Sequence, residues 1–474
     1  MDSNPELFKL HLKSAVEKFN SIDRKECIRI ISHYDTDGIT ACAILVQALM
    51  RKKRNFCISI VKQLTKDTIK SLAKENYGHY IFTDLGATSL SLMEEHLSSK
   101  NIIILDHHMP EKIEAGNNIT HLNSHLFGVD GGKDIAGSGV VYTFAKELDP
   151  GNKDLAYLAV VGAIGDCQER CGFTGVNHNI LKESVNYNQI TVREGLRIFG
   201  AETRPLYKVL ATSVDPYIPG ITGNEENAIS FLNELGISYK IGNDWRKPSS
   251  LTDEEMKRLA AGVIMKRAGE EDPEDVFGYT YIIKKQPKES PLRDAREFST
   301  LLNSCGRMNK GSLGIGVCLG DVKATKKAIE GQDKYKKELI RCLSWFRENR
   351  HSHFVIEEDG FIIINMEDNI MPSVTGTFAS MLSKSKKFKS GKLIMTMAQT
   401  IENTTKISLR IAGMTRTSSL DLRSIIHQII TVVGGESGGH QLAAGAIIKT
   451  DDEAKFLEVA KEILRKCAIE EVIR

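Results

Sequence analysis

Short apolar runs alternate with amphipathic stretches along the first 170 residues of the chain. The apolar runs are rich in β-branched residues and predict strands at residues 27–32, 56–61, 79–83 and 102–105. Between them, apolar positions at helical spacing predict helices at residues 39–50, 67–75 and 89–99. Strict alternation of strand and helix is typical of an α/β fold with a parallel sheet and helices on both faces. In such sheets ligands bind beyond the carboxyl ends of the strands.

The alternation stops at about residue 180. Residues 139–163 predict a helix that ends just before Asp166, and residues 195–285 predict a helical, charged insertion. A glycine-rich stretch at 311–320 leads into a long polar helix at 323–349, which we expect to connect two domains. The sequence therefore predicts a catalytic domain over residues 1–345 that includes the insertion.

Strands predominate after residue 350. They are expected at 354–357, 361–365, 392–398 and 406–411, with helices at 421–432 and 452–467. This mixture predicts a second, smaller α/β domain over residues 346–474, joined to the first by the long connector helix.

Acidic residues and histidines follow three of the predicted strands directly. His33 follows the first strand, Asp84 the third and Asp106 the fourth, so all three should reach one edge of the sheet. Nearby positions add further carboxylates and imidazoles: Asp35, Asp37, His107, His108 and Asp166. A two-metal site requires a bridging carboxylate with terminal carboxylates and histidines around it. The sequence supplies each of these groups.

Each of these motifs also has an ordinary interpretation. Asp35 and Asp37 could cap the helix that starts near Ile39, and two adjacent histidines are often a surface pair. Asp84 and Asp166, taken singly, could be loop acids. Their joint occurrence in this order favours the metal site, because capping alone seldom gathers such groups at successive strand ends.

A second motif lies near the end of the chain. Glycines 434, 435, 438, 439 and 445 surround His440 and would let the backbone approach a phosphate closely, although such a run can also be a simple loop. Arg410 ends a predicted strand upstream and could offer a bidentate guanidinium to a phosphate. The lysine-rich run 384–392 is either a solvated face or a track for a nucleic-acid backbone.

Composition restricts the class of protein only loosely. The 474 residues are 41% hydrophobic and 26% charged, with a net charge of +2, which neither supports nor excludes a nucleic-acid partner. Nine cysteines are scattered through apolar segments, the N-terminus is charged, and no run of 18 apolar residues occurs. We therefore expect a cytoplasmic protein with reduced thiols, no signal peptide and no membrane span.

These motifs resemble the DHH phosphoesterase superfamily, and within it the RecJ-like exonucleases. His33-x-Asp35-x-Asp37-Gly38, Asp84, Asp106-His107-His108 and Asp166 match the family's DHH domain, and Gly438-Gly439-His440 with Ala443-Ala444-Gly445 matches its DHHA1 domain. The resemblance spans the whole chain. Asn303-x-x-Gly306-Arg307 and the stretch 215–220 are similar to the archaeal branch, whose members resemble a eukaryotic replicative-helicase subunit. Glu436-Ser437 departs from the family by interrupting its glycine run.

The resemblance implies a role for each residue. Asp84 would bridge two divalent cations, Mn²⁺ preferred over Mg²⁺, and their shells would be completed by His33, Asp35, Asp37, His107 and Asp166. His108 would sit beside the reacting phosphate, and Asp106 would orient a histidine. Substrate would be bound by Arg307, Arg410, Gly438, Gly439 and His440.

The expected function is a metal-dependent exonuclease on single-stranded DNA or RNA, acting in DNA replication or repair. Two alternatives remain open. The protein could be a phosphodiesterase for small substrates, such as short oligonucleotides or cyclic dinucleotides. It could also be an accessory of a replication complex, in which the helical insertion would bind a GINS-type partner.

Overall fold

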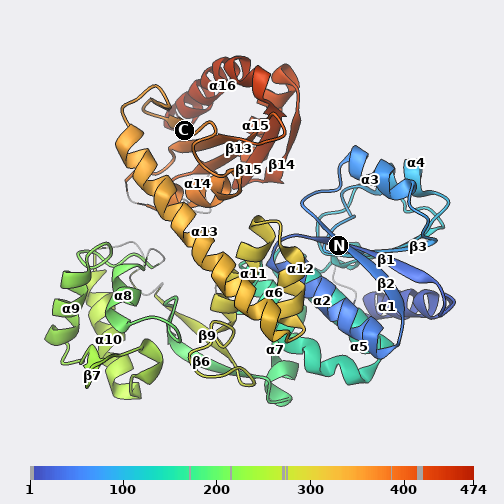
Figure 1. The fold of residues 1–474 in the computed structure, drawn as a ribbon, viewed down its shortest axis with the longest axis horizontal. Helices are drawn as coiled ribbons and strands as arrows, with labels where there is room; N and C mark the ends of the chain where they lie inside the picture. Colours follow the sequence, from blue (N-terminus) through green and yellow to red (C-terminus); the bar gives the residue numbers. More distant parts are fainter. Residues whose placement is uncertain are drawn as a thin grey trace. The chain divides into compact units, whose positions relative to one another are not determined.

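The computed structural model describes residues 5–473, except 170–171, 214–215, 270–272, 274–275, 386 and 414–419. The chain divides into two compact units, Met1–Gly331 and Gln332–Arg474 (Figure 1). This division lies within helix α13 (Val322–Asn349), upstream of the domain boundary that the sequence predicts at 345/346.

A five-stranded parallel sheet forms the centre of the first unit, in the order β2-β1-β3-β4-β5. Its strands are β1 (Cys27–His33), β2 (Asn55–Val61), β3 (His79–Thr83), β4 (Asn101–Asp106) and β5 (Ile119–Asn123). The first four were predicted from their apolar runs. The fifth, Ile-Thr-His-Leu-Asn, is too polar to give the same signal.

Helices cover both faces of this sheet, which confirms the predicted fold class (Figure 1). On one face α2 (Thr36–Arg51) and α5 (Gly137–Leu148) share a buried core with Ile28, Ile30 and Ile81. On the other face α3 (Lys66–Ala73) and α4 (Leu90–Leu97) pack with Ile31 and Phe82. Helix α1 (Pro5–Asn20) contacts α5 and β5.

One predicted segment of the first unit has a different structure, and one to which the sequence assigned no structure is a helix. The helix expected at 139–163 is interrupted: α5 ends at Leu148, a 3₁₀ turn spans Pro150–Leu155, and α6 runs from Ala156 to Gly165. Pro150 lacks the N–H that a continuous helix needs, and Asp149 caps the turn by accepting from the Gly151 N–H at 2.8 Å. The glycine-rich stretch near 311–320 is a helix, α12 (Gly311–Cys318), in which Gly311 lies close against Ile60.

The predicted insertion is attached through an antiparallel pair of strands. β6 (Ile190–Leu196) and β9 (Phe277–Ile283) pair along their length, with Leu196 opposite Phe277. Between them lie α8 (Leu206–Ala211), α9 (Glu225–Glu234), the hairpin β7 (Lys240–Ile241) and β8 (Asp244–Trp245), and α10 (Asp253–Lys266). The sequence missed β6, most of which lies just before the segment 195–285 that was expected to form the helical insertion. The insertion has its own apolar core, which includes Leu206, Phe231 and Leu259.

Two further helices complete the surroundings of the sheet in the first unit. α7 (Gly175–Asn186) contacts α6, and α11 (Ala295–Arg307) contacts both α6 and α2. Short 3₁₀ turns lie at Ser124–Phe127, Pro248–Ser250, Pro372–Val374 and Thr450–Asp452. None of the helices in the described ranges is both long enough and apolar enough to cross a bilayer.

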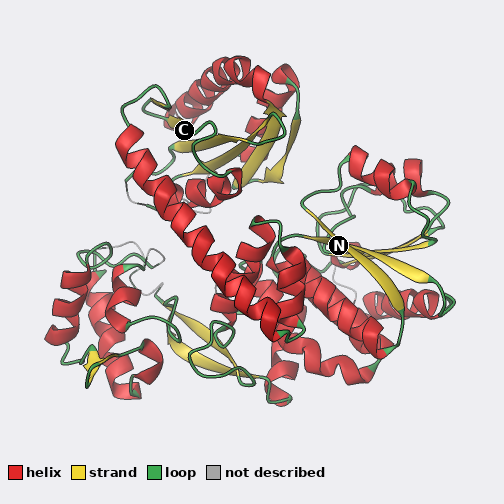
Figure 2. Ribbon diagram, in the orientation of Figure 1, coloured by secondary structure: helices red, strands yellow, loops and turns green. Residues whose placement is uncertain are grey.

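The second unit is a separate α/β domain with a six-stranded sheet in the order β10-β11-β12-β13-β15-β14 (Figure 2). Its strands are β10 (Val355–Glu357), β11 (Phe361–Asn365), β12 (Leu393–Gln399), β13 (Thr404–Ile411), β14 (Glu436–His440) and β15 (Ala443–Lys449). Its helices are α14 (Thr375–Lys384), α15 (Leu422–Val433) and α16 (Glu453–Ile473). The glycine-rich segment around His440 is therefore a β-hairpin, not the loop that its composition suggested.

Candidate metal centre

The order of the sheet places a ligand site between β1 and β3. The chain leaves β1 for β2 on one side and then returns to β3 on the other side, which makes this point a topological switch. His33 is the last residue of β1, Asp84 directly follows β3, and Asp106 ends β4. Ligands of open α/β sheets bind at such switch points, so the fold itself directs these side chains to one place.

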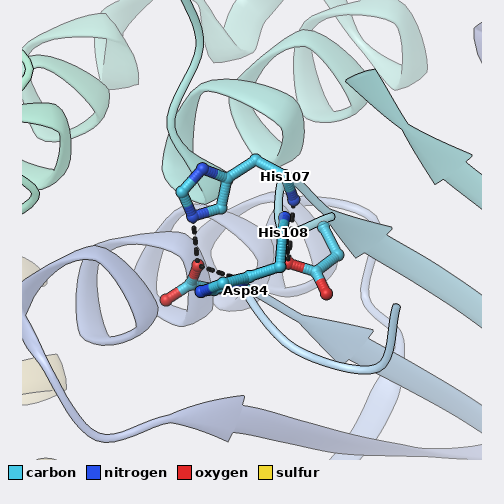
Figure 3. Close-up of side chains that lie close together, drawn as sticks. Asp84, His107 and His108 are labelled. Atoms are coloured by element: carbon cyan, nitrogen blue, oxygen red, sulfur yellow. Dashed lines mark hydrogen bonds and ion pairs between the residues drawn. The ribbon is translucent and has the colours of Figure 1, made fainter. Parts of the chain in front are cut away.

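Asp84 lies between two imidazoles. Its Oδ2 is 3.4 Å from Nδ1 of His33. Its Oδ1 is 3.2 Å from Nε2 of His107, as Figure 3 shows. The backbone of Asp84 has a φ of +59°, a left-handed conformation that Asp tolerates better than most residues, and its N–H donates to the Leu105 carbonyl at 2.9 Å. The side chain is almost completely buried, with 1% exposed.

The predicted ligands gather into three overlapping groups. In each group, one ligand atom per residue lies within 4.8 Å of the others: His33, Asp35 and Asp84; Asp84, Asp106, His107 and His108; and Asp37, His107 and Asp166. Asp84 and His107 each belong to two groups. The structure thus brings together every residue that the sequence nominated for the metal site or for catalysis.

Two of the acids also support helix ends. Asp35 caps α2, since its Oδ1 accepts from the Gly38 N–H at 3.0 Å, while its Oδ2 lies 3.0 Å from Nδ1 of His33. Asp37 accepts from the N–H groups of Gly137 and Ser138, at 2.6 and 3.0 Å, in the first turn of α5. A carboxylate has two oxygens with several acceptor positions, so the capping interpretation and the ligand interpretation are compatible.

Asp106 is fully buried and is surrounded by donors. Its Oδ1 accepts from the His107 N–H and from Nδ1 of His108, both at 2.8 Å. Its Oδ2 accepts from the Ala87 N–H at 2.9 Å. These bonds fix the orientation of the His108 ring, which is partly exposed.

Acid and imidazole groups perturb one another strongly in this buried site. Burial, together with repulsion from Asp84 and Asp166, raises the pKa of Asp37 well above its usual range. Burial also raises the pKa of Asp166 to about 7. Burial acts to lower the pKa of His107, but the neighbouring Asp84 and Asp166 outweigh it, so this pKa is raised well above its usual value. The site therefore holds an excess of negative charge that a cation would neutralise.

The donor set fits divalent cations. Both carboxylate oxygens of Asp84, Nδ1 of His33 and Nε2 of His107 are buried, and no described residue gives them a hydrogen bond of good geometry. Buried polar atoms without partners are costly unless an ion or water satisfies them. Carboxylate oxygens combined with imidazole nitrogens are ligands that Mn²⁺ and related transition metals accept.

Close backbone approach is a feature of the site that the motifs did not reveal. A Cβ added to Gly137 would lie 2.4 Å from Oδ1 of Asp84, so only glycine fits there. Asn303 was noted only as part of a motif, yet its Oδ1 accepts from the Thr36 N–H at 3.1 Å and so supports the loop between His33 and Asp37. Neither contact could be found without the fold, because each joins segments far apart in the sequence.

The residues proposed for substrate lie in both units. Arg410 on β13 and His440 on β14 flank Ala443, their common neighbour on β15. The Arg410 guanidinium donates from Nε to Ser380 Oγ at 3.0 Å. Gly438 and Gly439 belong to β14, whereas the side chain of His440 lies outside the described part of the structure. Arg307 is the last residue of α11, in the first unit.

Two other predicted segments are only partly described. The stretch 215–220 begins at Asp215, which lies outside the described residues, and so does Lys386 in the lysine-rich run. In that run Lys384, Lys387 and Lys389 are exposed, whereas Lys392 pairs with Glu357 at 2.8 Å.

Family models match three parts of the chain. Residues 27–163 match the DHH family N-terminal domain, residues 198–275 the DHH-CID domain, and residues 358–466 the DHHA1 domain. The middle match coincides with the insertion between β6 and β9. An uncharacterized protein of Methanocaldococcus jannaschii is 31% identical over 442 residues, which cover 92% of this chain and 93% of that protein.

Solved structures share the fold at low sequence identity. RecJ from Thermus thermophilus in complex with Mn²⁺ is 16% identical with a TM-score of 0.59; the match covers 97% of this chain but only 55% of that RecJ. An exonuclease RecJ bound to manganese is 16% identical, with a TM-score of 0.57 and coverage of 97% and 94%. CDC45 from Entamoeba histolytica is 13% identical, with a TM-score of 0.65 and coverage of 98% of each chain.

Proposed function

Because the chain belongs to the DHH superfamily of RecJ-like proteins, we propose that it is a two-metal exonuclease that hydrolyses single-stranded DNA or RNA. The observation that supports this most strongly is the shared position of Asp84, which belongs to two of the three ligand groups. A carboxylate shared in this way is what a two-metal centre requires as its bridge.

The side chains of this centre would have different roles. Asp84 would bridge, and the outer ligands would be His33, Asp35, Asp37, His107 and Asp166. Divalent cations bound there would supply Lewis acidity to a phosphodiester and to the attacking water. Asp106 holds the His108 ring through Nδ1, and His108 would sit beside the reacting phosphate. The mixed oxygen and nitrogen ligands favour Mn²⁺, with Mg²⁺ as the alternative.

The second unit would bind the rest of the strand. Arg410 and the glycine-rich strand β14 lie on either side of β15, so they can act together on neighbouring phosphates. His440 of the same unit is proposed as a further substrate-binding residue, and so, separately, is Arg307 of the first unit. Contacts to phosphates and sugars would give affinity for a strand without selecting its sequence.

The test is the Mn²⁺-dependent release of mononucleotides from end-labelled single-stranded DNA and RNA. We expect release by the native protein and none by Asp84→Asn, with the order of label loss giving the polarity. If the protein hydrolyses dinucleotides as fast as longer strands, the exonuclease proposal is wrong. The small-substrate phosphodiesterase would then be the better interpretation.

A role in a replication complex is a second candidate, because the insertion has its own core and supplies no residue to the three ligand groups. The register of β6 and β9 offers a direct test. Leu196 lies opposite Phe277, so an Asn-Gly turn can replace residues 197–276 and close the two strands into a hairpin. We expect this shortened protein to keep nuclease activity and to lose binding of a GINS-type partner. Retained binding would exclude the insertion as the docking element.

A further inference from the structure

His107 is held in one orientation by a backbone carbonyl. Its Nδ1 lies 2.6 Å from the Gly131 carbonyl oxygen, which can only accept a hydrogen bond. Nδ1 must therefore carry the proton, which leaves Nε2 directed at the carboxylates, 3.2 Å from Asp84 Oδ1 and 3.3 Å from Asp166 Oδ2. The position of the Gly131 carbonyl thus decides which nitrogen of His107 faces the metal centre.

Two buried side-chain amides form a series of hydrogen bonds that ends at the Gly131 carbonyl. Gln168 Nε2 donates to the Gly131 oxygen at 2.9 Å, and Asn177 Nδ2 donates to Gln168 Oε1 at 2.6 Å. At the far end, the Ala136 N–H donates to Asn177 Oδ1 at 3.3 Å. The side chains of Gln168 and Asn177 are 7% and 3% exposed.

The two backbone groups at the ends of this series of hydrogen bonds fix the direction in which its bonds donate. A backbone N–H at one end can only donate, and a backbone carbonyl at the other end can only accept. Both amides therefore have a single orientation that satisfies every bond, and a reversed amide would place two acceptors or two donors against each other. Buried networks of this kind are costly when they are only partly satisfied.

The hydrogen bonds of Gln168 and Asn177 reach the groups that hold all three residues of one ligand group, which are Asp37, His107 and Asp166. Gly131 orients His107, and Ala136 directly precedes Gly137, whose N–H donates to Asp37 Oδ2 at 2.6 Å. Gln168 itself follows Asp166 in the turn that ends α6, where its N–H donates to the Ala163 carbonyl at 3.0 Å.

We propose that Gln168 and Asn177 are positioning residues of the metal centre, which set the geometry of Asp37, His107 and Asp166 by locking the Gly131 carbonyl and the first turn of α5. This inference rests on the proposed function, because it assigns these amides to one of the two metals of that centre. Of the other two groups, the one with Asp84, Asp106 and His108 shares His107, whereas His33, Asp35 and Asp84 form no bond to the two amides among the described contacts. The two amides should therefore affect the binding of one metal ion and not of the other.

Two variants of the full-length protein test this. Gln168→Met removes the amide at similar length. Asn177→Asp keeps the volume, and its ionised carboxylate can only accept, so the Gln168 amide reverses and its oxygen faces the Gly131 carbonyl. Calorimetric titration with Mn²⁺ alone should show that the affinity of one of two sites falls about 10- to 100-fold in both variants. In strand hydrolysis kcat should fall while KM for the strand stays the same.

Asn152→Asp is the matched control. Asn152 is also fully buried, and its Nδ2 donates to the Ala145 carbonyl at 2.8 Å, in the turn between α5 and α6. We expect this control to lower the midpoint of thermal unfolding without changing either Mn²⁺ affinity. A purely structural role for the two amides would make all three variants behave alike.

The outcomes separate the two proposals. If the native protein binds Mn²⁺ and digests strands, and both test variants bind Mn²⁺ as tightly as it does, the positioning role is refuted and the proposed function stands. If the native protein binds no Mn²⁺, the proposed function fails first. Loss of one site in both test variants but not in the control supports the inference.

Discussion

Replacing Gly137 with alanine should damage the metal centre while leaving the fold nearly intact. Gly137 is the first residue of α5, where alanine is readily accommodated in the helical backbone. The new methyl would lie 2.4 Å from Oδ1 and 2.8 Å from Cβ of Asp84, whereas ordinary contacts start at 3.4 Å. Asp84 or the helix must therefore move by about 1 Å, and a misplacement of about 1 Å can cost about 100-fold in rate.

The assay combines strand hydrolysis with Mn²⁺ titration. For Gly137→Ala we expect a fall in kcat of about 100-fold and weaker Mn²⁺ binding, because the displaced carboxylate is the proposed bridge. Circular dichroism and thermal unfolding of the metal-free protein establish whether the fold survives. Gly78→Ala is the matched control, since an added Cβ there meets nothing within 4 Å.

Two results would refute this reasoning. Activity and Mn²⁺ affinity within about threefold of the native values would show that Asp84 tolerates the displacement or is not a ligand; threefold corresponds to only about 0.6 kcal/mol. A similar loss of activity in Gly78→Ala would show that the effect arises from glycine replacement in general.

Three further predictions test other parts of the structure. Mn²⁺ at 100 times its dissociation constant should raise the free energy of unfolding by about 2.7 kcal/mol, measured in urea, and Asp84→Asn should abolish this rise. Burial raises the pKa of Glu297 to about 7, so this acid destabilises the fold as pH rises from its unfolded value through 7; Glu297→Gln should stabilise the protein at pH 8, by at most about 3 kcal/mol, and much less at pH 5. Arg410→Gln should raise KM for a strand about tenfold, equivalent to about 1.4 kcal/mol, with Mn²⁺ affinity unchanged; a loss of metal binding would contradict the assignment of Arg410 to substrate.

The fold was predictable where one physical signal dominates. Apolar runs between helical stretches identified β1 to β4, and the rule for parallel sheets then placed His33, Asp84 and Asp106 at one edge. Where signals compete, the prediction was wrong. The glycines near His440 have low β-propensity and indicated a loop, but pairing with β15 makes them an edge strand, because tertiary contacts override local preference.

Other features could not be predicted from the sequence, because they depend on contacts between distant segments. Asp166 reaches the site from the end of helix α6, not from a strand, so strand periodicity alone could not place it. Asp37 was recognised as an acid near a helix start, yet its bonds go to the first turn of α5, a hundred positions along the chain. No local pattern encodes such a contact, since any residue with a backbone N–H could supply it.

This difference between ligands and supports explains which residues a motif can reveal. A metal ligand must be a particular side chain, so Asp84 and His107 can be recognised in the sequence by their residue types. Most of their supports are backbone groups, such as the Gly131 carbonyl and the Gly137 N–H, and these leave no trace in residue identity. Gln168 and Asn177 differ, because they support the site through side-chain amides whose replacement changes the bonds. Positions of this kind should therefore respond to substitution like ligands, although no motif marks them.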